Sequence, residues 1–99
     1  MTRWESITVE ATGWPGWPEG REEFPAALGR YIEAGGLTYR ATADLLGSRD
    51  ADLAGLDGNT LCRYVTGRRG PPHPCVQRRI ISILQTASLS TILRSIPLQ

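Results

Sequence analysis

Residues 57–67 read DGNTLCRYVTG, and this stretch carries the clearest helical pattern in the chain. Asp57 is a favoured N-cap residue, and Gly67 is a typical C-terminal stop. Apolar side chains recur between them at helical spacing, at Leu61, Tyr64 and Val65. We therefore expect a short helix over about residues 58–66 that buries this one face.

Two helices are expected before this stretch. The first begins around Phe24-Pro25 and ends at Gly35-Gly36, because proline is tolerated in a first turn and glycine favours a helix end. Its apolar stripe comprises Phe24, Ala27, Leu28, Tyr31 and Ile32. The second has Thr38 as its N-cap and ends at Gly47. Its inner face comprises Ala41, Leu45 and Leu46.

The remaining segments complete an all-α fold of five helices. Residues 48–55 form a loop or a single helical turn. A fourth helix runs from about Pro74, and a short fifth helix over residues 89–96 ends at Pro97. Residues 1–20 form an N-terminal arm with short strand character at Ile7-Thr8-Val9, and residues 21–99 form the domain.

Charge is divided unevenly along the chain. All ten acidic residues lie at or before Asp57 together with five arginines, so residues 1–57 carry a formal charge of −5. Residues 58–99 hold six arginines and no acid, a charge of +6. Such a basic half is typical of proteins with a polyanionic partner, although the two halves could also neutralise each other within one fold.

Two stretches together resemble a known family. Residues 37–47 read LTYRATADLLG, and residues 59–71 read NTLCRYVTGRRGP. They resemble the helix-turn-helix family of Cro and the phage repressors (XRE type), in which Leu-Thr opens the second helix and Leu-Gly ends it, and basic residues and a proline follow the third. The similarity covers about residues 28–84. Residues 48–55 lengthen the turn relative to the family, Thr42 stands where leucine is usual, and Val65 stands where glutamate is common.

This resemblance implies that the third helix enters the major groove of double-stranded DNA while the second crosses the backbone. By position, the base-facing residues would be Asn59, Cys62 and Arg63. Phosphate contacts would come from Thr38, Tyr39, Arg40, Arg68 and Arg69. Three alternatives stay open: Arg63 contacts phosphate or only solvent, Asn59 caps the helix, and Cys62 is a half-buried thiol.

The function implied is that of a sequence-specific transcriptional regulator, a repressor of phage or mobile-element type that acts on its own promoter. A homodimer would bind a palindromic operator with half-sites one helical turn apart. The C-terminal helix would form the dimer contact through Leu89, Ile92, Leu93 and Ile96. Trp14 and Trp17, each directly before a proline, are further interface candidates. Burial within the same chain is the alternative for both groups.

Other classes of function are weighed against this one. A protein-interaction module on the same scaffold, such as an antitoxin or inhibitor, is favoured by the lengthened turn, the tryptophan arm and the acidic first half. An enzyme is not expected, because the only histidine, His73, has no nucleophile or carboxylate pattern beside it and is better interpreted as an N-cap or phosphate contact. The absence of lysine excludes Schiff-base chemistry and a Walker-type phosphate loop.

No cofactor, metal or membrane partner is expected. Cys62, His73 and Cys75 are too few, and wrongly spaced, for a structural zinc site. No apolar stretch approaches the roughly 20 residues that cross a bilayer. The N-terminus lacks the pattern of a secretory signal, so we expect a cytoplasmic protein.

Overall fold

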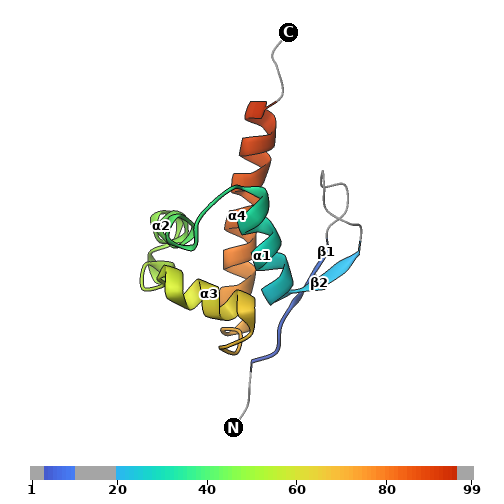
Figure 1. Cartoon of the computed structure of the whole chain (residues 1–99), viewed down its shortest axis with the longest axis vertical. Helices are drawn as coiled ribbons and strands as arrows, with labels where there is room; N and C mark the ends of the chain where they lie inside the picture. The colour runs from blue at the N-terminus through green and yellow to red at the C-terminus, as the bar shows by residue number, and fades with distance from the viewer. Residues whose placement is uncertain (1–3, 11–19, 96–99) are drawn as a thin grey trace.

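The computed structural model of the chain describes residues 4–10 and 20–95, with side chains up to residue 87. The described part is mostly helical, as predicted, and contains one small sheet of two strands (Figure 1). Its elements, in chain order, are β1 (Thr8–Glu10), β2 (Arg21–Glu23), α1 (Phe24–Ala34), α2 (Tyr39–Arg49), the 3-10 turn η1 (Ala51–Leu53), α3 (Gly58–Thr66) and α4 (Pro74–Ser95).

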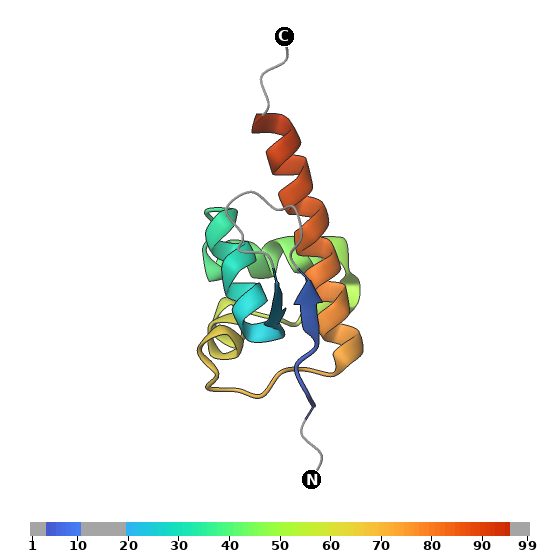
Figure 2. The same ribbon diagram turned by 90° about the vertical axis from the view of Figure 1, so that its right-hand side faces the viewer.

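The prediction of five helices is wrong, because the fourth and fifth expected helices form one. α4 continues without interruption through the expected boundary between Leu84 and Leu89. Neither glycine nor proline lies between these residues, so no backbone feature stops the helix there. Figures 1 and 2 both show the C-terminal half of α4 extending beyond the other elements.

The β element of the arm is a strand that pairs with a second strand. β1 runs antiparallel to β2, with Val9 opposite Glu22. The strand at β1 matches the predicted strand character, whereas β2 was not predicted because its sequence, Arg-Glu-Glu, is polar. The amide of Phe24, at the start of α1, donates to the carbonyl of Ile7 at 2.9 Å. Figure 2 shows the strand pair lying beside α1 and α4.

The first helix agrees with its prediction. α1 begins at Phe24, has proline in its first turn and ends at Ala34, with Gly35 as its C-cap. All five residues of the predicted stripe are buried in the core: Phe24, Ala27, Leu28, Tyr31 and Ile32. α3 and α4 contribute Leu61, Tyr64, Ile80, Ile81 and Leu84 to this core, and the other elements add Val9, Ala43, Leu46 and Leu53.

The second helix differs from its prediction in its end and its inner face. α2 continues past Gly47 to Arg49, and the amide of Asp50 still donates to the carbonyl of Leu46 at 2.9 Å. Gly47 therefore lies inside the helix, where a Cβ would stand 3.2 Å from the Cα of Ala54 in the following turn. The buried positions of α2 are Thr42, Ala43 and Leu46, whereas Ala41 and Leu45 are only half-buried.

The lengthened connection between α2 and α3 contains one turn of 3-10 helix, as one of the two predicted alternatives had it. Leu53 in this turn is only 1% exposed, so the turn is packed onto the core by its one buried side chain. Asp50 caps the turn by accepting a hydrogen bond from the Asp52 amide at 3.0 Å. In the described part of the chain, no helix is apolar enough over sufficient length to cross a membrane.

Candidate nucleic-acid interface

The N-termini of α2 and α3 lie against each other. A Cβ built on Gly58, the first residue of α3, would lie 3.1 Å from the backbone nitrogen of Arg40 and 3.3 Å from its Cα. Glycine permits this approach because it has no side chain. The first amides of a helix have no partner within the helix and mark the positive end of its dipole. Two such ends therefore meet at one place on the surface.

Both helix starts are capped as predicted. The hydroxyl of Thr38 accepts a hydrogen bond from the Ala41 amide at 3.0 Å, and the Asp57 carboxylate accepts one from the Thr60 amide at 2.7 Å. The backbone and side-chain hydrogen bonds from Thr60, followed by the charge of Arg63, lower the pKa of Asp57 from its ordinary value of 3.8. These caps stabilise the first turns of α2 and α3, whose N-termini lie against each other.

The predicted base-facing residues lie on the accessible part of α3. Asn59 and Arg63 are exposed, and Cys62 is half-buried, as its alternative interpretation held. Asn59 and Cys62 line a hollow of about 530 Å³ between α2 and α3, together with Tyr39 and Arg40. The fold thus places two residues that are expected to contact bases beside two that are expected to contact phosphates. Arg63, the third expected base contact, does not line this hollow.

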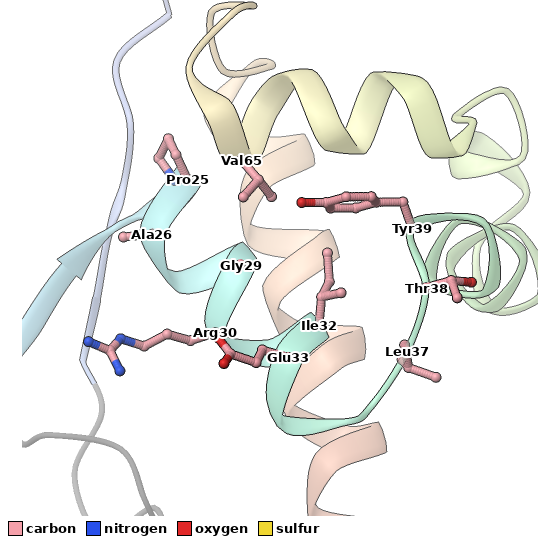
Figure 3. Close-up of a pocket in the computed structure, with 10 residues that line it drawn as sticks. All are labelled: Pro25, Ala26, Gly29, Arg30, Ile32, Glu33, Leu37, Thr38, Tyr39 and Val65. Atoms are coloured by element: carbon pink, nitrogen blue, oxygen red, sulfur yellow. The ribbon is translucent and has the colours of Figure 1, made fainter.

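Tyr39 has a second environment besides this hollow. It also lines a groove of about 790 Å³ along α1, with Gly29, Ile32, Leu37 and Val65 among the other lining residues. In Figure 3 its side chain points along α3 toward Val65. Tyr39 as a whole is half-buried, and its donors to a phosphate would be its hydroxyl and its backbone amide.

Residues 68–73, which we call the basic loop, leave α3 through a tight turn. Gly67 has a φ of +75°, a conformation that favours glycine, and ends the helix as predicted. The Arg69 amide donates to the carbonyl of Arg63 at 3.2 Å, and the Arg69 guanidinium lies 5.7 Å from the centre of the Tyr64 ring. Arg68 is exposed. His73 acts as a cap, because its Nδ1 accepts a hydrogen bond from the Cys75 amide at 3.1 Å.

The ion pairs between described side chains lie outside the candidate interface. Among the described side chains, Arg21 pairs with Glu10, Arg30 with Glu22, and Arg79 with Asp50 and Asp52. No ion pair within that set involves the four arginines of the candidate interface, which are Arg40, Arg63, Arg68 and Arg69. Their charge is thus not neutralised by direct contact with a described acid, although Asp44 and Asp57 also line the hollow between α2 and α3.

The predicted dimer residues lie outside what the structure describes. Leu89, Ile92 and Leu93 lie in α4, but the structure describes side chains only up to residue 87. Ile96, Trp14 and Trp17 are outside the described residues altogether. The dimer contact therefore stays a prediction.

Two noteworthy residues were not predicted. Gln77 is completely buried in α4, and Trp4 is half exposed with its ring against His73. Gln77 stands three and seven residues before Ile80 and Leu84, so its position on the buried stripe could have been found from helical spacing. Nothing in the sequence pattern indicates the partner of Trp4.

Comparison with known proteins adds no relative: no family model, curated protein or solved structure matches this chain. Within the described residues, no group of three or more His, Cys, Asp or Glu side chains is placed to hold a metal ion.

Proposed function

We propose that this protein is a sequence-specific DNA-binding transcriptional regulator of the helix-turn-helix kind, with α3 as the helix that reads the major groove. The observation that carries the proposal is the close approach of Gly58 to Arg40, which sets the N-termini of α2 and α3 side by side at the surface. In helix-turn-helix proteins the N-terminal residues of the second helix of the motif contact base edges, while the first helix crosses the backbone.

The side chains around this point suit the two kinds of contact. Asn59 and Arg63 are exposed on α3, and such side chains recognise adenine and guanine edges through paired hydrogen bonds. Thr38 and Arg40 at the start of α2 are exposed and would contact phosphates beside unpartnered helix amides. Arg68 and Arg69 would contact the backbone at the other end of α3.

The electrostatic argument supports the same face. The four interface arginines, defined above, form no ion pair with a described acid, so binding phosphate would not require an existing pair to be broken. Phosphate contacts release condensed counterions and supply much of the affinity of DNA-binding proteins. As a repressor of phage or mobile-element type, the protein would bind a palindromic operator near its own gene as a homodimer.

A protein-interaction module is the second candidate function. It is favoured by Asp44 and Asp57, which line the same hollow as Asn59 and Cys62 and would oppose a phosphate there. A basic protein segment would be accommodated by these acids. The two functions thus predict opposite effects of removing the Asp44 charge.

The first experiment is a fluorescence anisotropy titration of the purified protein with the DNA upstream of its own gene. It is run at two salt concentrations with an excess of random competitor DNA. We expect binding that resists the competitor and weakens steeply with salt, because several phosphates are neutralised. Binding that disappears with competitor, or is absent, would contradict the proposal and favour the interaction module.

A further inference from the structure

Gln77 joins three parts of the chain through one side chain. Its Oε1 accepts a hydrogen bond from the Ile7 amide at 2.8 Å, and its Nε2 donates to the carbonyls of Glu5 and Pro72, both at 2.7 Å. The residue is 0% exposed, so these bonds are made away from water. We call these three hydrogen bonds the Gln77 bridge. It connects α4 to the N-terminal segment (residues 4–7) and to the far end of the basic loop.

The basic loop is anchored at both of its ends. At the near end, the Arg69 amide is bonded to the Arg63 carbonyl and the Arg69 guanidinium lies over Tyr64. At the far end, the Pro72 carbonyl is held by the Gln77 bridge. Arg68 projects from the near end, exposed and without an ion pair to a described acid. Arg68 therefore lies on a segment that is anchored on both sides.

The N-terminal segment touches the far end of the loop a second time. The Trp4 ring lies edge-on to the His73 ring, with 4.5 Å between centroids and 65° between planes. His73 in turn caps α4 by accepting from the Cys75 amide. In Figures 1 and 2, the segment before β1 passes next to the loop that joins α3 to α4. The segment thus closes over the end of the loop that Gln77 holds.

We propose that Gln77 is a positioning residue of the DNA-binding surface, which keeps Arg68 in place to contact a phosphate although Gln77 itself does not touch DNA. The inference rests on the proposed function. An arginine on a loop that is already ordered loses less conformational freedom on binding than one on a free loop, so the anchor strengthens binding. The N-terminal segment contributes by covering the same anchor.

A double-mutant cycle tests this role, because residues that act through one another give non-additive effects. The variants are Arg68→Ala, Gln77→Met and the two combined, measured by competitor-resistant anisotropy titration of the full chain. We expect Arg68→Ala to weaken binding about fivefold and to lower the salt slope by about one. Gln77→Met should cause a loss of similar size, and the double variant should bind about as weakly as Gln77→Met alone.

Two controls separate positioning from general loss of structure. Arg40→Ala removes an expected phosphate contact at the start of α2, and its effect should multiply with that of Gln77→Met. Ile81→Val alters another buried residue of α4 and should leave the affinity and salt slope of the folded protein unchanged. The inference would be overturned if the losses of affinity caused by Arg68→Ala and Gln77→Met multiply in the double variant, as the losses caused by Arg40→Ala and Gln77→Met are expected to do.

A second variant keeps the test decisive if Gln77→Met does not fold. Trp4 is 50% exposed, so Trp4→Ala leaves the core intact while it removes the contact with His73. We expect the double variant Trp4→Ala with Arg68→Ala to lose less DNA affinity than the product of the two separate fold-losses. A loss equal to that product would overturn the inference, while binding by the wild type would still support the proposed function. Wild-type protein that does not resist competitor would overturn both.

Discussion

Arg79 of α4 donates a hydrogen bond from Nη1 to Oδ2 of Asp52, 2.7 Å away in the connection between α2 and α3. Its Nε also lies 3.6 Å from a carboxylate oxygen of Asp50. The Arg79 and Asp52 side chains are exposed, and exposed ion pairs contribute little to stability, so the burial of Leu53 is the stronger tie. The lengthened connection is thus attached to the core by Leu53 and to the long helix α4 by Arg79.

The close approach of Gly58 to Arg40 predicts an unfavourable effect of Gly58→Ala. Alanine is favoured over glycine in a helix by about 1 kcal/mol, but its Cβ would press on the Arg40 backbone at 3.1–3.3 Å. Because a backbone cannot yield as a flexible side chain does, we expect a net loss of about 1–3 kcal/mol in the free energy of unfolding. Urea unfolding measures this loss.

The matched control for this substitution is Gly55→Ala in the preceding turn. A Cβ at Gly55 meets no atom within 4 Å, and its φ does not lie in the left-handed region. Gly55→Ala should therefore leave the stability unchanged or raise it slightly. Equal losses for the two variants would show that the contact with Arg40 is not the cause.

Arg63, in the last turn of α3, and Arg68, in the basic loop that follows the helix, are expected to contribute differently to DNA binding. Arg63→Ala should relax the preference for one base pair of the operator, because a base contact costs about 1–3 kcal/mol of discrimination. Arg68→Ala should weaken binding to all sequences alike. Titrations against operator variants and random DNA at several salt concentrations distinguish these outcomes. A uniform loss for both variants would remove the base-reading role of Arg63.

The Asp57 cap predicts a pH-dependent contribution to stability. Its pKa is lowered in the folded state by the hydrogen bonds from Thr60 and by the Arg63 charge, from an ordinary value of 3.8. A lowered folded-state pKa means that the contribution is complete above about 3.8 and is lost as the pH falls below it through the folded-state pKa. Asp57→Asn keeps a capping oxygen but does not titrate.

Urea midpoints of the wild type and Asp57→Asn, measured between neutral pH and the acid range, test this prediction. The wild type should be the more stable at neutral pH, and the difference should shrink once the pH falls below the unfolded-state pKa. A difference that stays constant with pH would show that the carboxylate charge contributes nothing to the cap.

Asp44→Asn distinguishes the two candidate functions. Asp44 is exposed at the hollow between α2 and α3, so for a DNA-binding protein the loss of its charge should strengthen binding about two- to threefold at low salt. Glu33→Gln, at the end of α1, is the control and should have a smaller effect. Weaker association with a basic protein partner in Asp44→Asn, with DNA binding unaltered, would favour the interaction module.

Features that depend on neighbouring residues could be predicted from the sequence. The caps at Thr38 and Asp57 and the stop at Gly67 are formed within a few residues, so the local pattern contains all the partners. The buried stripe of α1 follows from helical spacing alone. The number of helices was predicted wrongly, because the second set of apolar residues, from Leu89 onward, continues α4 and does not form a separate helix.

Other features were decided only by tertiary structure. α2 extends past Gly47, and Ala54 of the following turn approaches that glycine so closely that a Cβ would stand 3.2 Å from its Cα, which a local pattern does not reveal. Gly58 could be read as an ordinary first-turn residue, and only its approach to Arg40 shows why a side chain is excluded there. Gln77 meets the Ile7 amide across seventy positions of the chain. Such a partner has no sequence signal, because a buried amide can be satisfied by any backbone group that the fold brings to it.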